Sequence, residues 1–209
     1  NFDIKKIEEF KNVVNKFNVC GLNVTIPYKE SIINQLDYIN PIAKEIGAVN
    51  TIKFQNNILS GYNTDYLGFY KSIENLIKPN TKALILGTGG ASKAVAYALK
   101  ILKVKYLFVS RSKKNKDYIN YSEINQEIID NHKLVINCTP IGTYPVTEQI
   151  PQIPISLIND SHIVYDLIYN PTKSLLLKKS QENGATIING YQMLENQALE
   201  SWKIWNSNP

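Results

Sequence analysis

The chain has 209 residues, of which 44% are hydrophobic and 20% are charged, with ten Gly and nine Pro. At roughly 150 residues per domain, this length corresponds to one large domain or two small ones, and the composition excludes disordered and collagen-like chains. The formal net charge of +5 is too small to indicate nucleic-acid binding without a clustered basic face. We therefore predict no nucleic-acid partner, and phosphate-bearing small molecules stay open as partners.

The apolar segments are short. None approaches the roughly 18 residues needed to cross a bilayer, and the first ten residues lack the apolar core of a signal peptide. We expect a cytoplasmic protein without a membrane partner. Cys20 and Cys138 lie in separate apolar runs, with no second Cys or His at ligand spacing. This pattern predicts two buried, reduced thiols and no metal site.

Hydrophobic spacing predicts an α/β pattern in the first 77 residues. Apolar side chains recur at three- and four-residue intervals from Phe2 to Phe17, which is the helical period. Segments rich in β-branched residues favour strands, and Pro27 ends the first of them. The predicted helices are 2–17, 30–37, 41–46 and 66–77, and the predicted strands are 20–26, 48–54 and 58–62.

Beyond the break at 78–80, predicted strands and helices alternate. This alternation is typical of a parallel sheet with crossover helices. The predicted strands are 83–86, 106–109, 134–137, 163–167 and 185–188, and the predicted helices are 91–102, 122–129, 173–182 and 192–205.

A glycine turn joins the first of these strands to the first helix. Its sequence is Gly87-Thr88-Gly89-Gly90-Ala91, and this context is the one that a dinucleotide fingerprint requires. Gly87 permits a tight turn, whereas Gly89 and Gly90 let the backbone approach a pyrophosphate at the helix N-terminus. The turn therefore indicates a Rossmann-type domain, and an ordinary strand-to-helix turn is the alternative.

The next strand ends in Ser110-Arg111-Ser112, and Arg111 is the only arginine in the sequence. An acidic residue near this position would hold the ribose of NAD, whereas Arg accommodates the 2′-phosphate of NADP. The planar guanidinium binds phosphate in a way that Lys cannot reproduce. We therefore predict NADP as the cofactor, with a solvated basic turn as the alternative.

Short polar motifs lie at the ends of the predicted strands in the first half of the chain. They precede Lys29, surround Asn50 and include Asp65. By themselves they indicate only that polar groups line a cleft. In chain order, however, the motifs NVTIPYK, GAVNT, GYNTD, GTGGAS, NCTPIG, YDLIYNP and GYQMLENQA resemble those of shikimate dehydrogenases. The resemblance extends over nearly the whole chain.

This resemblance implies a reversible, NADP-dependent reduction of 3-dehydroshikimate to shikimate, a step of chorismate and aromatic amino-acid biosynthesis. It implies that Lys29 transfers the proton and that Asp65 is its partner. Such positioned proton transfer typically contributes about 10²–10⁴-fold to a rate. The implied substrate-binding residues are Thr25, Asn50, Tyr169 and Gln197. The implied cofactor-binding residues are Gly87, Thr88, Gly89, Gly90, Ala91, Ser110, Arg111, Ser112, Thr139, Leu167 and Gly190.

We expect a substrate domain over residues 1–66, completed by 190–209, and a Rossmann-type NADP-binding domain over 67–189. The active cleft would lie between them. Family members begin with a strand and a Ser-x-Ser loop that binds the substrate carboxylate, and this sequence contains no counterpart. We therefore expect an N-terminally incomplete domain and a 209-residue protein that aggregates or binds substrate poorly. Ser110 also stands where the family commonly has Asn.

Three other functions are alternatives to this one. The nearest is an enzyme that acts on quinate as well as shikimate. A folate-type methylene dehydrogenase has a similar layout, but it would need an aromatic stacking platform that the sequence does not place. A non-catalytic NADP-binding regulatory module would not require both Lys29 and Asp65. For the oligomeric state, we expect a monomer or a homodimer.

Overall fold

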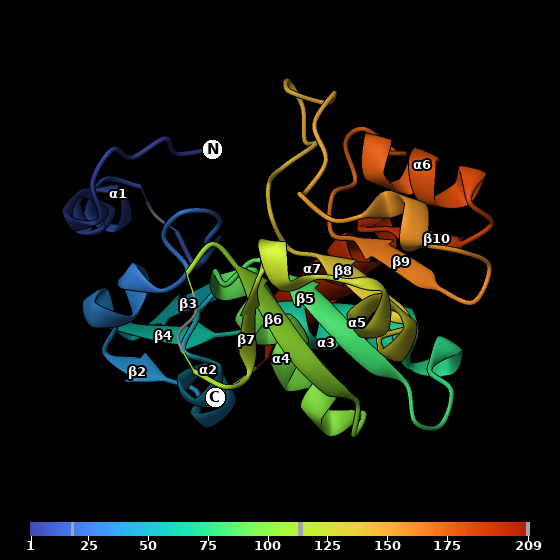
Figure 1. Cartoon of the computed structure of the whole chain (residues 1–209). Coiled ribbons are helices and arrows are strands. Elements are labelled where there is room, and N and C mark those ends of the chain that lie inside the picture. The colour runs from blue at the N-terminus through green and yellow to red at the C-terminus, as the bar shows by residue number, and fades with distance from the viewer. Residues whose placement is uncertain (18, 113–114, 208–209) are drawn as a thin grey trace.

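The structure, a computed structural model, describes residues 1–17, 19–112 and 115–207. Two β-sheets organise this part of the chain, and they lie side by side (Figure 1). The smaller sheet has the strand order β1-β3-β4-β2, and the larger has the order β10-β9-β8-β5-β6-β7. This arrangement confirms the predicted α/β fold with a Rossmann-type parallel sheet.

The smaller sheet is built around a hairpin. Asn56 and Asn57 both adopt positive φ between its two strands, as the tight turn of a hairpin requires. The outer strands pair antiparallel with β3 and parallel with β4. The strands are β1 (Gly21–Asn23), β2 (Tyr38–Ile39), β3 (Thr51–Gln55) and β4 (Ile58–Tyr62). The accompanying helices are η1 (Ile7–Glu9), α1 (Phe10–Lys16), η2 (Ser31–Gln35) and α2 (Pro41–Ile46).

All strand pairs of the larger sheet are parallel. Its central strands are almost fully buried because helices cover both faces, as parallel sheets require. The strands are β5 (Lys82–Leu86), β6 (Lys105–Ser110), β7 (Tyr118–Asn120), β8 (Leu134–Asn137), β9 (Ile163–Asp166) and β10 (Thr186–Asn189).

The helices divide between the two faces of this sheet. One core cluster joins the sheet to α3 (Asp65–Ile73), α4 (Gly90–Ile101) and the start of α7 (Tyr191–Asn206). The opposite cluster joins it to α5 (Gln126–Asn131) and α6 (Leu175–Glu182). The short 3-10 helices are η3 (Glu74–Leu76), η4 (Tyr121–Glu123) and η5 (Ile155–Leu157).

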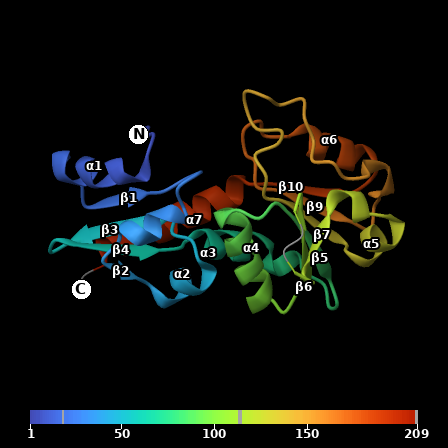
Figure 2. The ribbon, with the colours of Figure 1, turned by 60° about the vertical axis from the view of Figure 1, so that its left-hand side comes forward.

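Helix α7 connects the two sheets. It begins directly after β10 and runs toward the smaller sheet (Figure 2), where Trp205 Nε1 donates to the carbonyl of Ile52 at 2.9 Å. Along the way it packs against α3, and the Asn196 amide donates to the Gly68 carbonyl at 3.3 Å. The last helix therefore belongs to both halves of the molecule.

Several predicted elements differ in the structure. Residues 2–17 are helical only from Ile7 to Lys16. Within 30–37, only Ser31–Gln35 are helical, as a 3-10 helix that precedes β2. Strand β7 was not predicted, because three residues are too few for a period to emerge. Cys20 is exposed, contrary to expectation, because it precedes the short edge strand β1. Among the described residues, no helix combines the length and apolar character needed to span a membrane.

The contact between α3 and α7 gives a first prediction. A Cβ added to Gly68 would lie 2.7 Å from the Met193 carbonyl oxygen, which is backbone and cannot rotate away. An ordinary helical Gly→Ala change stabilises a protein by about 0.5–1 kcal/mol. We expect Gly68→Ala to do the opposite and to lower the free energy of unfolding by about 1–3 kcal/mol through overpacking. Urea unfolding monitored by circular dichroism measures the change, and a stabilised variant would contradict the packing described.

Candidate active site

Lys29 and Asp65 form an ion pair at the seam between the two sheets. Lys29 Nζ lies 2.5 Å from Asp65 Oδ2, and the two side chains are 16% and 6% exposed. Asp65 is the first residue of α3, where the helix dipole favours a carboxylate. An ammonium group has three donors, and Asp65 takes one. Within residues 1–17, 19–112 and 115–207, no second acceptor holds this ammonium, which leaves two donors for a ligand.

Asn50, directly before β3, fixes the other oxygen of the carboxylate. Its Nδ2 donates to Asp65 Oδ1 and to Thr64 Oγ1, both at 2.9 Å. Its Oδ1 accepts from the Thr64 backbone N–H at 2.7 Å. Both the nitrogen and the oxygen of the Asn50 amide are therefore hydrogen-bonded, and this amide orients the Asp65 carboxylate. Gln197 on α7 also contacts this amide, because its Oε1 accepts from Asn50 Nδ2 at 3.2 Å.

A buried hydroxyl cluster that the sequence analysis missed supports this arrangement. Ser201 Oγ lies 2.7 Å from Thr51 Oγ1 and 3.0 Å from Thr64 Oγ1. All three residues are at most 1% exposed. Ser201 follows Gln197 by one helical turn, on the same face of α7. The four-residue spacing between Gln197 and Ser201 could have indicated Ser201 in the sequence. Serine is too common on helices for this spacing alone to identify it.

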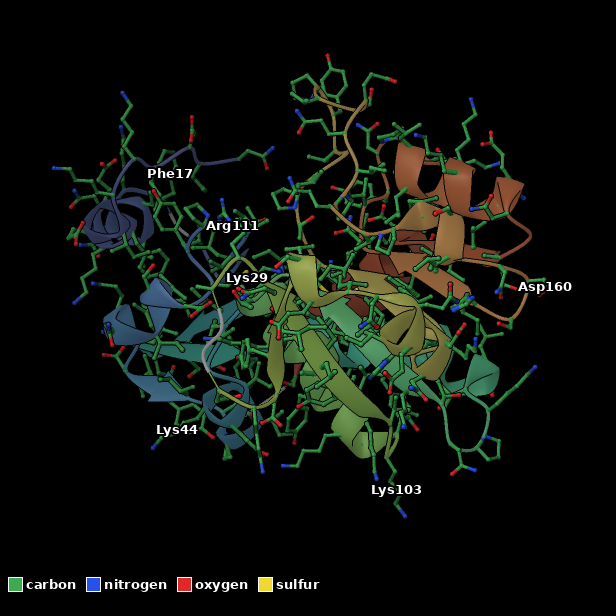
Figure 3. All side chains as sticks on the ribbon, viewed as in Figure 1. Phe17, Lys29, Lys44, Lys103, Arg111 and Asp160 are labelled. Atoms are coloured by element: carbon green, nitrogen blue, oxygen red, sulfur yellow. The ribbon has the colours of Figure 1, made fainter. Side chains whose placement is uncertain are left out.

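A cavity of about 970 Å³ lies beside the ion pair. It opens at the carboxyl ends of β5, β6 and β8, where the strand order reverses direction and ligands of such sheets bind. Lys29 lines it on the side of the smaller sheet, and Arg111 lines it too (Figure 3). The predicted residues that line it are Lys29, Gly87, Thr88, Gly89, Gly90, Ala91, Ser110, Arg111, Ser112 and Thr139.

The glycine turn touches Lys29 directly. A Cβ on Gly90 would lie 2.9 Å from Lys29 Cβ and 3.3 Å from Ala48 Cβ. Only a residue without a side chain permits this approach. The turn predicted to bind a cofactor and the lysine predicted to transfer a proton therefore share one wall of the site, although they lie about sixty residues apart.

The other seven predicted residues do not line the cavity: Asp65, Asn50 and Gln197 lie in the network described above, and Thr25, Tyr169, Leu167 and Gly190 lie elsewhere. Thr25 and Tyr169 are exposed, and neither lines the cavity. Leu167 and Gly190 contact each other, since a Cβ on Gly190 would lie 2.0 Å from the Leu167 carbonyl oxygen. Packing alone is enough to require glycine there. The catalytic and binding roles of all the predicted site residues stay predictions.

A second residue that the sequence analysis missed is a buried carboxyl. Asp166, at the end of β9, is fully buried. Burial raises the pKa of its carboxyl from 3.8 to about 6, although hydrogen bonds from Ser174, Ile168 and Asn137 oppose this shift. A carboxyl in the motif YDLIYNP gives no sign of burial in the sequence, because Asp is usually exposed.

This raised pKa predicts a pH dependence of stability. A carboxyl whose pKa is higher in the folded state contributes stability that is full below about 3.8 and is lost as pH rises through about 6. Relative to Asp166→Asn, we expect the wild-type free energy of unfolding to fall by about 3 kcal/mol across this window. Urea unfolding at several pH values between about 4 and 7 measures the difference. Parallel curves for the two proteins would show that Asp166 does not titrate in this way.

Known proteins resemble this chain in sequence and in fold. The model of the shikimate dehydrogenase substrate binding domain matches residues 1–52. Shikimate dehydrogenase (NADP(+)) of Clostridium botulinum strain Hall is 43% identical over an alignment of 217 positions. The alignment covers 98% of this chain and 83% of the relative.

Two crystal structures of shikimate dehydrogenases are also similar. The enzyme of Aquifex aeolicus has a TM-score of 0.85 at 40% identity, over 98% of this chain and 79% of that one. Shikimate dehydrogenase 1 of Peptoclostridium difficile has a TM-score of 0.87 at 37% identity, over 100% of this chain and 80% of that one. Sequence, fold and the order of the motifs agree, and the chain belongs to the shikimate dehydrogenase family.

Proposed function

We propose that this protein catalyses the reversible, NADP-dependent reduction of 3-dehydroshikimate to shikimate. The observation that carries the proposal is the contact between Lys29 of the ion pair and Gly90 of the glycine turn. A proton donor and a dinucleotide-binding turn are the two parts that a carbonyl reduction by hydride transfer needs. The names of the relatives, which state shikimate and NADP(+), support the same activity.

The residues around the cavity fit a dinucleotide. Its volume of about 970 Å³ is at the upper end of the range of small-molecule sites, about 300–1,000 Å³. Gly87 has a φ of +101°, and a Cβ on Gly89 would meet nothing within 4 Å. Helix α4 begins here without a side-chain cap, so its first N–H groups can bind phosphate.

We assign the parts of the site to NADP accordingly. The turn from Gly87 to Ala91 would hold the pyrophosphate. Arg111, with Ser110 and Ser112 beside it, would hold the 2′-phosphate. Thr139, Leu167 and Gly190 would lie toward the nicotinamide. When bound, NADPH supplies the hydride to the carbonyl carbon of the substrate.

The chain's own residues would manage the proton. The Lys29 ammonium donates to the substrate oxygen that becomes the hydroxyl, and in the oxidation direction the amine takes the proton back. Asp65 and Asn50 fix the direction of Lys29 through the short contacts described above. Asn50 and Gln197, with Thr25 and Tyr169, would bind the remaining substrate groups.

Three further features of the proposal concern the whole chain. The substrate domain would comprise residues 1–66 with 190–209, and the cofactor domain 67–189, so that α3 and α7 join the two. We propose a cytoplasmic protein that is a monomer or a homodimer. Quinate is the alternative substrate, and rates with the two acids separate the alternatives.

Lys29→Ala tests the proton-transfer role. We expect the initial rate of NADP reduction with shikimate to fall by about 10²–10⁴-fold, because a positioned acid–base group is lost. Lys44→Ala is the control, since Lys44 is an exposed residue of α2 (Figure 3), and its rate should match that of the wild type. An unchanged rate in Lys29→Ala would exclude the role. A wild-type protein that binds NADP but turns over neither acid would support the regulatory module instead.

Arg111→Gln tests the choice of cofactor. Hydrogen bonds to a charged group are worth about 1.5–3 kcal/mol, so NADP should bind at least tenfold more weakly while the affinity for NAD changes little. Lys103→Gln removes an exposed charge far from Arg111 (Figure 3) and should alter neither affinity. Isothermal titration calorimetry measures all of these constants. Equal losses for NADP and NAD would show that Arg111 does not contact the 2′-phosphate.

A further inference from the structure

Asp166 is a buried carboxyl that the proposed chemistry does not use. It is 0% exposed, and a buried carboxylate costs free energy unless hydrogen bonds or a cation compensate it. The partners that the structure shows are all neutral: one hydroxyl, one side-chain amide and one backbone N–H. An apolar residue would avoid this cost, so the position of the carboxyl calls for an explanation.

The two oxygens of Asp166 hold different elements. Oδ2 accepts from Ser174 Oγ at 2.5 Å, and Ser174 caps α6. Oδ1 accepts from Asn137 Nδ2 at 3.0 Å and from the Ile168 backbone N–H at 3.1 Å. The carboxyl therefore ties the end of β9 to the end of β8 and to the turn that follows β9.

Asn137 passes this constraint to the wall of the cavity. It is fully buried at the end of β8. Its Oδ1 accepts from both the backbone N–H and the hydroxyl of Thr139, at 3.0 Å and 2.7 Å. Thr139 Oγ1 in turn accepts from the Ile141 backbone N–H at 3.3 Å. The Asn137 amide donates to Asp166 at 3.0 Å and, at the longer distance of 3.5 Å, to the Ile141 carbonyl. Asp166 is thus the closer of the two acceptors that orient the group on which Thr139 depends.

The loop held in this way borders the cofactor cavity. Thr139, Pro140 and Ile141 all line it. Thr139 also faces the glycine turn, since a Cβ on Gly87 would lie 3.1 Å from Thr139 Cγ2. If Asn137 rotated, its carbonyl would release Thr139, and the loop would move relative to the turn.

We propose that Asp166 is a positioning residue that acts through Asn137 to hold the loop 139–141 in the shape that NADP binding requires. The proposal rests on the proposed function, because it takes NADP as the ligand. It assigns to Asp166 an effect on cofactor affinity and no contact with cofactor or substrate.

The test compares NADP affinity among variants of the full chain by isothermal titration calorimetry. Asp166→Ala removes the 3.0 Å acceptor of the Asn137 amide and leaves that amide only the Ile141 carbonyl, at 3.5 Å. We expect the Kd of this variant for NADP to rise at least tenfold. Asp166→Asn retains an oxygen that can accept from Asn137 and Ile168, and we expect it to bind NADP within about threefold of wild type. The KM for NADP should rise in Asp166→Ala while the KM for shikimate stays within about twofold.

Ser174→Ala is the matched control. It removes the partner of the other carboxylate oxygen. If Asp166 had only a structural role, Ser174→Ala and Asp166→Ala would lose NADP affinity to a similar extent. The proposal predicts a lower melting temperature in Ser174→Ala with NADP affinity within about twofold of wild type. If Asp166→Ala does not fold, Asn137→Ala decides, because it breaks the same link and leaves Asp166 in place.

The outcomes separate this proposal from the proposed function. Wild-type protein that does not bind NADP would refute the proposed function and this inference with it. Wild-type protein that binds NADP, together with a folded Asp166→Ala or Asn137→Ala variant of unchanged Kd, would overturn the positioning role alone. An equal loss of affinity in Ser174→Ala would overturn it as well.

Discussion

The largely buried ion pair between Lys29 and Asp65 is the interaction on which the site depends. Removing two charges from water costs several kcal/mol per ion unless the geometry is good and the remaining groups are hydrogen-bonded. Asn50 and the N-terminus of α3 meet that condition for Asp65. Asp65 is therefore held by hydrogen bonds on both of its oxygens. The buried hydroxyls behind Asn50 limit how far this arrangement can relax.

The same pair requires the two halves of the molecule to meet closely. Gly90 gives Lys29 room against the glycine turn, and Gly68 gives α7 room against α3. Two exposed ion pairs, Lys93 with Glu30 and Lys100 with Glu45, also join α4 to the smaller-sheet half. Exposed pairs contribute little to stability, so the packing of helices, more than surface charge, sets the distance between the halves. The site is consequently sensitive to substitutions that add volume at this seam.

The sequence predicted those features of the fold and site that depend on residues close together in the chain. The alternation of strands and helices predicted the larger sheet, and the glycine turn after an apolar strand predicted the edge where the cavity lies. Ser201 and Asp166 were not predicted, because their importance arises from partners distant in sequence. Ser201 is hydrogen-bonded to Thr51, which is 150 positions away in the sequence, and Asp166 to Asn137, which is 29 positions away. Hydrophobic periodicity does not reveal whether a single polar side chain is buried. Strands β2 and β7 were also missed, because they are too short to show a periodic pattern.

The most direct measurement is a crystal structure of the chain with NADP and shikimate bound. The account predicts that Lys29 Nζ lies about 2.6–3.2 Å from one ring hydroxyl oxygen, with Asp65 still held by Asn50 and the phosphates of NADP on the turn at Gly89 and Gly90. The carbon that bears that hydroxyl should face the nicotinamide. A complex in which the acid lies away from Lys29, or in which NADP does not contact the glycine turn, would contradict it.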